Sequence, residues 1–472
     1  MRNIIKAGFC FVLPLIVFTG CGDSNASDGD NGSGSGELEL YGELDVKKFG
    51  AVGDGQTDDT EIIQAAIDKC ASKLGTVVFP SGTYYTRPLF MKSNVTLRLE
   101  DGAVILGSPN KKDYDDAFPN AGSIETSALI YGKGLANIKI TGTGKIDGQG
   151  DSSSFQLGNG SSGRPKLLHF ISCNNVTVEN IQLVNSAFWT SHFLLCDGLK
   201  ITGVKIYCHS NWNNDGIDID SKNVEVSDCV VDCDDDGICF KSDRSTLCEN
   251  VTVKNCTIRT NCNAIKFGTA GKGGFKNVTV SDCVVEKASE DNFRKWKQSV
   301  TWAGITQDVS ATAGIAIESV DGGVLDGATI SNIRMTGIQT PIFIRLGDRQ
   351  RAFSSNISQL KNVTISDVTA TAVSKIACSV TGVPGGIIEN VTIKNISMTL
   401  PGGGTATEAN QTVPEKAGDY PENRMFGVVL PAYGFYVRHV DGISFENIQI
   451  NLNATDARPM YKFEDVTNYS TN

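Results

Sequence analysis

The amino-acid sequence predicts an all-β fold, a single-stranded parallel β-helix with a capping helix at its N-terminal end. Three observations favour this fold. The chain of 472 residues is rich in glycine (50) and poor in proline (13), which is typical of a protein with many short strands and turns. A short strand pattern recurs about every 25 residues along most of the chain. One amphipathic helix pattern stands ahead of these strands.

The first 41 residues are expected to lie outside the folded domain. Arg2 and Lys6 precede an apolar run, residues 7–18, which is too short to span a bilayer and is typical of an export signal. Residues 18–21 (FTGC) resemble a bacterial lipobox, so residues 1–21 are interpreted as a lipoprotein signal peptide in which Cys21 is lipidated. Ordinary secretion with cleavage nearby is the alternative. Residues 22–41 are interpreted as a flexible linker, because residues 22–37 are polar and rich in Gly and Ser.

This N-terminus predicts a protein of the bacterial cell envelope, anchored in the outer membrane on its periplasmic or surface face. Contact with the membrane is expected only through the lipid anchor, because no later segment is apolar enough to span a bilayer.

The folded domain is predicted to run from residue 42 to residue 472 and to begin with a cap. Asp58-Asp59-Thr60-Glu61 is a helix start signal, and it is followed at helical spacing by Ile62, Ile63, Ala66, Ile67 and Cys70. This helix would close one end of the solenoid ahead of a strand at residues 76–79. We expect one domain and a monomer.

The repeat consists of Asn or Asp-Gly, then alternating apolar residues, then a second Asn or Asp, as in KNVEVSDCVV and ENVTVKNCTI. Its first apolar residue falls at Val176, Leu199, Val224, Val251, Val278, Ala328, Val363, Val391 and Ile443. The intervals from Val278 to Ala328 and from Val391 to Ile443 are about twice the usual length. We therefore predict an additional coil in each, at residues 314–318 and 435–439.

Short strands at this period predict a parallel β-helix with roughly three strands per coil. A propeller blade would need about 40 residues, and leucine-rich repeats would need a recurring leucine pattern that is absent. The Asn before each strand is expected to occupy a turn with positive φ and to stack in ladders from coil to coil.

Charge and cysteine content exclude some functions. The net charge of −11 argues against a nucleic-acid partner, because phosphate binding requires a basic surface. An acidic sugar would also be repelled and would need local Lys or Arg. Without Cys10 and Cys21, 12 of the 14 cysteines remain, and several fall inside apolar strand patterns and are interpreted as core residues, with disulfides as the alternative. No spacing typical of a zinc site occurs, so no metal is predicted.

The stretch from Asn213 to Ser242 carries an acidic cluster that folding alone explains poorly. Asp215 is followed about twenty residues later by Asp235 and Asp236, with an alternating strand pattern between them. This distance is close to one coil, and neighbouring coils lie about 4.8 Å apart. Asp215 and the pair are therefore expected to face each other across adjacent coils. A solvated turn or a calcium site is the alternative to catalysis.

Several segments resemble a known family. FGAVGDGQTDDTEIIQAAIDKC resembles the opening of pectinase-type β-helix enzymes. ITGTGKIDGQG, NSAFWTSHFLLC and NNDGIDIDSKNVEVSDCVVDCDDDGICFKS resemble glycoside hydrolase family 28, the polygalacturonase family. The resemblance implies a right-handed β-helix with an open cleft, and inverting hydrolysis of an α-linked acidic sugar without a cofactor.

The resemblance also implies roles for the acidic cluster. The family's Asn-x-Asp motif corresponds to residues 213–215 and its Asp pair to residues 235–236, which makes Asp235 the general acid and gives Asp215 and Asp236 the task of activating water. The physical argument agrees, because an inverting glycosidase needs two carboxyl loci about 6.5–9.5 Å apart. Clustered carboxylates also raise the pKa of one of their number.

Two family motifs are missing. Gly-His-Gly is expected near residues 261–266, which contain no His, and Arg-Ile-Lys is expected at residues 316–318, where Ala316 and Glu318 replace the basic residues. Rhamnogalacturonan-cleaving relatives also lack that His. The departures therefore indicate a pectic linkage other than that of an ordinary endo-polygalacturonase.

Six further residues are candidates for substrate binding. Lys241 and Lys266 stand at corresponding places after two strands and could bind one uronic-acid carboxylate together; solvated strand ends are the alternative. Glu318 could bind hydroxyls, act as an extra acid or form a structural ion pair, and Arg345 could bind a carboxylate through two hydrogen bonds. His192 could orient a sugar or a water or be a core residue, and Trp212 could stack on a sugar ring.

The sequence therefore predicts an inverting hydrolase of a pectic polysaccharide or oligosaccharide, of galacturonan or rhamnogalacturonan type. A polysaccharide lyase on the same fold and a non-catalytic carbohydrate-binding solenoid are the alternatives. Loops that close one end of the cleft would restrict such an enzyme to chain ends, and residues 286–313 and 402–423 are the candidates for these loops.

Overall fold

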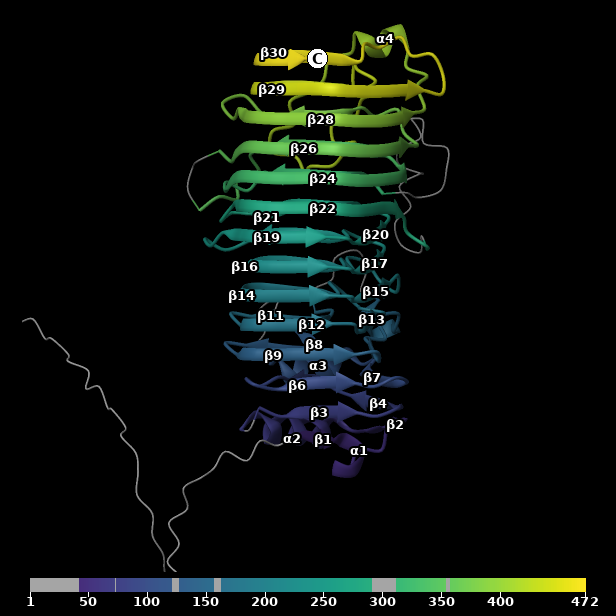
Figure 1. Cartoon of the computed structure of the whole chain (residues 1–472), viewed down its shortest axis with the longest axis vertical. Helices are drawn as coiled ribbons and strands as arrows, with labels where there is room; N and C mark the ends of the chain where they lie inside the picture. The colour runs from purple at the N-terminus through teal and green to yellow at the C-terminus, as the bar shows by residue number, and fades with distance from the viewer. Residues whose placement is uncertain (1–41, 73, 121–126, 157–162, 291–310, 354–356) are drawn as a thin grey trace, which may run out of the picture. The chain divides into compact units, whose positions relative to one another are not determined.

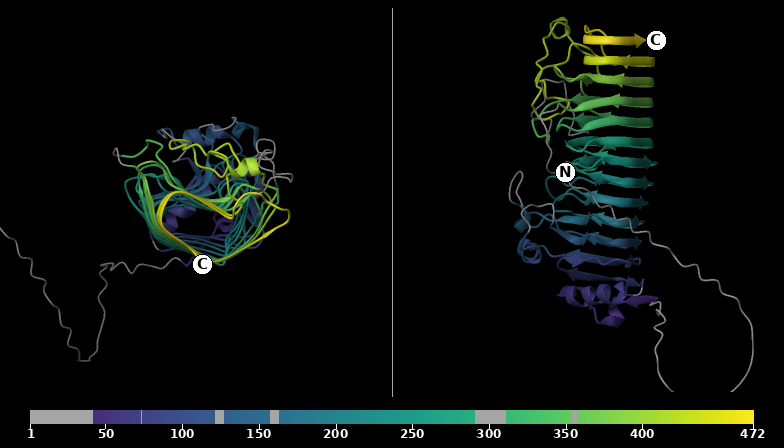
Figure 2. Two further views of the ribbon diagram at one scale, coloured as in Figure 1. Left: turned by 90° about the horizontal axis from the view of Figure 1, so that it is seen from above. Right: turned by 90° about the vertical axis from the view of Figure 1, so that its left-hand side faces the viewer.

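The computed structural model describes residues 42–72, 74–120, 127–156, 163–290, 311–353 and 357–472. Its strands pair in parallel within one sheet that winds into a solenoid, with successive coils stacked along one axis (Figure 1). Viewed along this axis, the coils superpose around a common core (Figure 2). The predicted parallel β-helix is therefore confirmed.

The signal peptide, Cys21 and the linker lie outside the described residues, so these predictions are untested. In the described part of the chain, none of the helices combines the length and the apolar character that crossing a membrane requires.

The helices are α1 (Val46–Phe49), α2 (Thr60–Ala71), α3 (Lys111–Ala117), the 3₁₀ helix η1 (Ser153–Phe155) and α4 (Ala406–Ala409). The strands of the N-terminal half are β1 (Glu43–Asp45), β2 (Asp54–Asp58), β3 (Thr76–Phe79), β4 (Gly82–Thr86), β5 (Leu89–Phe90), β6 (Thr96–Leu99), β7 (Ala103–Gly107), β8 (Ala128–Lys133), β9 (Ala136–Gly142), β10 (Lys145–Asp147), β11 (Lys166–Ile171), β12 (Asn174–Glu179), β13 (Gln182–Val184), β14 (Ser191–Thr202), β15 (Lys205–Cys208) and β16 (Ile217–Ser227). Those of the C-terminal half are β17 (Val230–Cys233), β18 (Ile238–Ser242), β19 (Cys248–Lys254), β20 (Thr257–Thr260), β21 (Asn263–Gly271), β22 (Phe275–Lys287), β23 (Ala313–Ser319), β24 (Val324–Ile338), β25 (Thr340–Leu346), β26 (Gln359–Ala372), β27 (Cys378–Thr381), β28 (Ile388–Leu400), β29 (Phe435–Leu452) and β30 (Tyr461–Thr471).

The coils contribute strands to three parallel stacks. The first stack includes β6, β9, β12 and β19, together with parts of the long strands β14, β16, β22, β24, β26, β28 and β29. The second stack includes β4, β7, β10, β13, β15, β17 and β20. The third stack runs through β8, β11, the starts of β14 and β16, and then β18, β21, β23, β25 and β27. It carries the candidate site.

The predicted repeat is a row of buried residues in the first stack. Its members pair with one another in the predicted order along the chain, starting from Val176 with Leu199, and all of them are buried. The prediction of two additional coils is wrong, because Val278 pairs directly with Ala328 and Val391 with Ile443. Residues 314–318 (in β23) and 435–439 (in β29) belong to the third stack of the same coils. The long intervals therefore arise from insertions that precede β23 and β29.

Asparagine side chains form the predicted ladder at the turn that enters the first stack. Asn223, Asn250 and Asn277 have φ of 56°, 55° and 54°, a left-handed conformation that Asn tolerates better than most residues. Asn250 Nδ2 donates to Asn223 Oδ1 (3.1 Å), and Asn277 Nδ2 donates to Asn250 Oδ1 (2.9 Å). Each amide thus ties one coil to the next and supports the register of the backbone.

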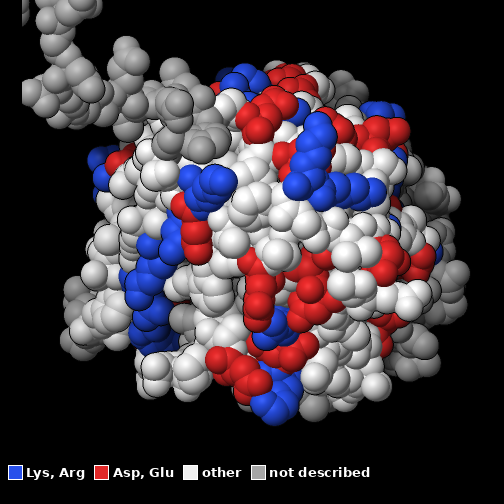
Figure 3. All heavy atoms as spheres, turned by 90° about the horizontal axis from the view of Figure 1, so that it is seen from below, with Lys and Arg blue, Asp and Glu red and all other residues white. Residues whose placement is uncertain are grey.

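The predicted cap is α2, which buries Ile63, Ala66, Ile67 and Cys70 against the first coils. The 12 described cysteines are free and buried, in agreement with their interpretation as core residues. Seen from the N-terminal end, the surface carries both acidic and basic side chains (Figure 3).

Candidate active site

The acidic cluster lies where two neighbouring strands of the third stack begin. Asp215 precedes β16, and Asp235 and Asp236 precede β18. The Gly216 amide donates to the Asp236 carbonyl (2.9 Å), so Asp215 and Asp236 occupy equivalent places in adjacent coils. The expected stacking of the two acidic points is therefore confirmed.

The glycine after each acid allows this close stacking. A Cβ atom at Gly216 would lie 2.4 Å from Val231 Cγ1 and 2.6 Å from the Gly237 carbonyl oxygen. A Cβ atom at Gly237 would lie 2.8 Å from the Ala264 carbonyl oxygen. Any side chain at these positions would push the coils apart and separate the acids.

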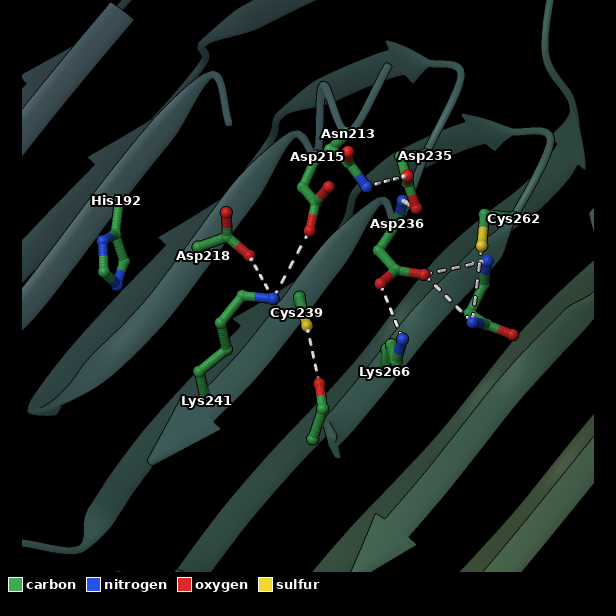
Figure 4. A network of polar contacts seen from close by, with 12 residues as sticks. His192, Asn213, Asp215, Asp218, Asp235, Asp236, Cys239, Lys241, Cys262 and Lys266 are labelled. Atoms are coloured by element: carbon green, nitrogen blue, oxygen red, sulfur yellow. Dashed lines mark hydrogen bonds and ion pairs between the residues drawn. The ribbon is translucent and has the colours of Figure 1, made fainter. Parts of the chain in front are cut away.

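Two asparagines hold Asp235. Asn214 Oδ1 accepts hydrogen bonds from the backbone amides of Asp234 and Asp235, both at 3.2 Å, which fixes the turn. Asn213 Nδ2 donates to Asp235 Oδ2 (3.3 Å), while the Asp236 amide donates to Asp235 Oδ1 (2.9 Å). Figure 4 shows the Asp235 side chain beside Asn213, whereas Asp215 and Asp236 are linked to lysines.

Lys241 and Lys266 neutralise the cluster from two sides. Lys241 Nζ lies 3.3 Å from Asp215 Oδ2 and 3.1 Å from Asp218 Oδ1, and Lys266 Nζ lies 2.8 Å from Asp236 Oδ2. Both side chains are buried. The prediction that the two lysines occupy corresponding positions after their strands is wrong, because Lys266 pairs with Cys239, which lies two residues before Lys241. The two ammonium groups therefore contact different carboxylates of the cluster (Figure 4).

Burial and charge set the protonation of the cluster. Burial raises the pKa of Asp236, but the ammonium groups of Lys266 and Lys241 outweigh it and hold the pKa of this carboxyl below its ordinary value. Burial raises the pKa of Asp218 well above its ordinary value, and the nearby Asp215 adds to this effect. The site thus combines an ionised carboxylate at Asp236 with a carboxyl at Asp218 that retains its proton to higher pH.

Glu318 lies behind Lys266 and has no exposed surface. Its Oε2 is 3.9 Å from Lys266 Nζ, and burial raises its pKa to about 8. In this structure it can influence a substrate only through Lys266.

Arg345 is buried and contacts backbone rather than the pocket. Its Nη1 donates to the Gly382 carbonyl (2.9 Å), and its Nη2 donates to the carbonyls of Glu415 (2.7 Å) and Lys416 (3.0 Å). The predicted carboxylate-binding role is therefore wrong for this structure, since the guanidinium holds the segment between β28 and β29 in place.

His192 and Trp212 lie outside the pocket that contains the acids. His192 is buried, stacks on His169 with ring centroids 4.8 Å apart, and places its Nδ1 3.0 Å from Lys166 Nζ. Trp212 is half-buried and does not line this pocket. The tryptophan that does line it is Trp189, whose ring centroid lies 4.3 Å from Lys241 Nζ.

The acids and lysines line one pocket of about 220 Å³, which we call the main pocket. This is smaller than the ~300–1,000 Å³ of pockets for drug-sized ligands, so it suits about one sugar ring. Its walls also include Trp189, Asn213, Cys262, Asn263, Thr269, Ala270, Thr312, Tyr420 and Glu422.

The sequence interpretation missed Asp218 and Tyr420. The alternation of Asp218 and Asp220 with buried isoleucines in β16 is a signal that could have identified Asp218. Tyr420 had no local signal, because its strand-free segment reaches the pocket only through tertiary contacts. Its hydroxyl lies 3.2 Å from Lys266 Nζ.

Asp235, Asp236 and Cys262 are the described residues whose donor atoms could hold a metal ion, with one atom of each within 4.8 Å of the others. Lys266 Nζ already places a positive charge 2.8 Å from Asp236. The expectation that no cofactor is needed stays a prediction.

A family model described as glycosyl hydrolases family 28 matches residues 105–418, more than half of the chain. The chain belongs to this family. It is 32% identical over 211 residues to a probable polygalacturonase of Vitis vinifera, a match that covers 41% of this chain and 43% of the relative. An exo-poly-alpha-D-galacturonosidase of Dickeya chrysanthemi is 39% identical over 121 residues, which cover 23% of this chain and 19% of the relative. The family 28 chain thus spans less than half the length of these curated relatives.

Solved structures share the fold of this family 28 chain. The family 28 exopolygalacturonase of Yersinia enterocolitica has a TM-score of 0.68 at 19% identity, over 91% of this chain and 78% of that one. The exopolygalacturonase of Thermotoga maritima has a TM-score of 0.61 at 19% identity, over 87% and 91% of the two chains. These likenesses show the right-handed parallel β-helix that the resemblance implied.

Glu318→Gln is predicted to make the stability of this family 28 protein less dependent on pH. Because burial raises the pKa of Glu318 from 4.5 to about 8, the folded protein keeps a proton at intermediate pH that the unfolded chain releases. As pH rises from about 5 to about 8, this group should lower the free energy of unfolding by up to about 1.4 kcal/mol per pH unit.

Urea denaturation of wild type and variant at both ends of this pH range measures the difference. Glu286→Gln is the matched control, because this half-exposed carboxylate pairs with Arg259 (2.9 Å) away from the pocket. A Glu318→Gln variant whose stability falls with pH as steeply as that of the wild type would contradict the assignment.

Proposed function

We propose that this protein is an inverting glycoside hydrolase that acts on the galacturonan or rhamnogalacturonan type of pectic chain. The observation that carries the proposal is the presence of Asp215, Asp235 and Asp236 at equivalent strand starts of two adjacent coils, in one pocket with two lysines. Membership of glycosyl hydrolases family 28 supports the same reaction.

The lysine partners of Asp215 and Asp236 support their roles as bases, while the resemblance to the family assigns the acid to Asp235. Asp215 and Asp236 each contact an ammonium group, and such a contact favours the ionised form that a base requires. These two carboxylates take a proton from a water, whose oxygen forms the new bond to the anomeric carbon. Asp235, which is held by Asn213, gives its proton to the departing glycosidic oxygen. Attack and departure on opposite faces of the sugar invert the anomeric configuration.

The positive charges of the main pocket support an acidic sugar as substrate. The net charge of the chain is −11, so a uronic acid is attracted only where basic groups lie within reach. Lys241 and Lys266 supply two such groups beside the acids, and Tyr420 Oη lies within hydrogen-bond distance of Lys266. The names of the relatives, which include several polygalacturonases, support galacturonate as that sugar.

The strap, residues 401–434 between β28 and β29, supports action at chain ends. Arg345 binds the carbonyls of residues 415 and 416, Arg438 Nη1 donates to the Val413 carbonyl (2.8 Å), and Asn423 Nδ2 donates to the Thr312 carbonyl (2.9 Å). These bonds hold Tyr420 and Glu422 as a wall of the main pocket. A wall on the side of the C-terminal coils would stop a polysaccharide from passing through the cleft. The other predicted closing segment, residues 286–313, lies largely outside the described residues.

Asp235→Asn should reduce the release of reducing sugar from polygalacturonate at least about 100-fold, because it removes the proton that the leaving oxygen needs. Asp197→Asn, which alters an exposed aspartate that accepts from Asn223 (2.7 Å), serves as the control and should keep wild-type activity. Near-wild-type activity of Asp235→Asn would refute the role of Asp235. Products that absorb in the ultraviolet through a new double bond would indicate a lyase, and glycan binding without any product would indicate a non-catalytic protein.

Polygalacturonate digestion should release mono- or disaccharide from the first minutes, with a slow fall in viscosity, because the strap confines cleavage to one chain end. Chromatography of early products and viscometry measure this. Polymers blocked at either the reducing or the non-reducing end identify the end that enters the main pocket. A ladder of intermediate oligosaccharides with a rapid loss of viscosity would rule out end-specific cleavage.

A further inference from the structure

A second, smaller pocket of about 140 Å³ adjoins the main pocket. We call it the side pocket, and its polar walls are His192, Asp220, Lys241, Asp243 and Arg244. Trp189, Lys241 and Ala270 line both pockets, so the two cavities meet across these three residues.

The side pocket lies away from the strap. His192 pairs with Asp218, Asp218 with Cys239, and Cys239 with Lys266, so His192 lies three coils before Lys266 in the third stack. Figure 4 shows His192 and Lys266 on opposite sides of Lys241. A sugar chain whose end meets Tyr420 and Glu422 can therefore continue over Lys241 into the side pocket.

A buried acid in the side pocket has one oxygen without a partner. Asp220 is 2% exposed; its Oδ2 accepts from the Asp243 amide (3.0 Å), while Oδ1 has no hydrogen-bond partner. An unsatisfied buried oxygen of this kind costs about 1–3 kcal/mol, and a ligand hydroxyl would remove that cost. Burial raises the pKa of Asp220 to about 7, although the Asp243 amide opposes this, so at mildly acidic pH the group can donate as well as accept.

The charges around Asp220 suit an acidic sugar. Lys241 and Arg244 bring positive charge to the walls, and the negative charge of Asp243 is paired with Lys272 Nζ at 3.2 Å. Burial, together with the charge of Lys166, keeps the pKa of His192 well below its ordinary value, so His192 adds no charge at neutral pH. The Trp189 ring offers an apolar surface beside the sugar path.

We propose that the side pocket is a second sugar-binding subsite, which takes a uronic-acid unit of the chain whose end occupies the main pocket. Asp220 Oδ1 binds a hydroxyl of this unit, and Arg244 binds its carboxylate. Arg suits this task because its guanidinium can donate two parallel hydrogen bonds to one carboxylate. The inference rests on the proposed function and extends it from the reacting sugar to a neighbouring one.

The test is binding of galacturonate and trigalacturonate to the full-length Asp235→Asn protein, measured by calorimetry. In this background trigalacturonate should bind more tightly than galacturonate, because only the longer ligand reaches both pockets. Adding Arg244→Gln or Asp220→Ala should reduce this preference at least about tenfold, the effect expected for one lost hydrogen bond to a charged or buried group.

Two further variants serve as controls. Asp220→Asn keeps an oxygen and a donor at the site and should retain the preference. Arg259→Gln removes an arginine that pairs with Glu286 on another stack and should also retain it. Circular dichroism confirms that each variant is folded.

The inference is overturned if adding Arg244→Gln or Asp220→Ala leaves the preference for trigalacturonate within about twofold of that of the Asp235→Asn protein alone. If the wild type cleaves polygalacturonate, this result excludes only the role of the side pocket as a subsite, and the proposed function stands. If the wild type cleaves no polygalacturonate, the proposed substrate fails first, and the inference fails with it.

Discussion

The register in which one coil hydrogen-bonds to the next determines the site. Asp215 and Asp236 come together because Ile217 pairs with Ile238 and because the Gly216 amide donates to the Asp236 carbonyl. A slip of one residue would turn alternate side chains to the opposite face of the sheet. The asparagine ladder and the closely approaching glycines oppose such a slip, so features that stabilise the solenoid also set the distance between the acids.

Several carboxylates in one small pocket repel one another, and two buried lysines offset this repulsion. Lys241 is shared between Asp215 and Asp218, and Lys266 lies between Asp236 and Glu318. Desolvation of an unpaired charge would be strongly unfavourable, so the loss of either lysine is expected to destabilise the fold. The family's Arg-Ile-Lys is absent from this chain, where Ala316 and Glu318 replace its basic residues. Lys266 pairs with Ala316, so a positive charge stands one coil before the position at which the Arg is missing.

The sequence predicted the features that depend on local pattern. The repeat positions of the first stack, the capping helix and the stacking of Asp215 on Asp236 all follow from spacing, and the structure confirms them. The prediction of two additional coils was wrong because a doubled interval between repeats does not distinguish an extra coil from an insertion within one coil. The side chains of Arg345 and Tyr420 depend on the path of the strap, which contacts of distant residues determine. Trp189 rather than Trp212 lines the pocket, a difference between two turns that periodicity does not encode.

In the proposed reaction, water attacks the anomeric carbon directly while Asp235 protonates the departing oxygen. The most direct test is proton NMR during the first turnovers of an α-linked galacturonate oligosaccharide. The new reducing sugar should appear first as the β anomer and reach the mixture of anomers only later, by mutarotation. Initial appearance of the α anomer would show retention through a covalent intermediate and would contradict the account.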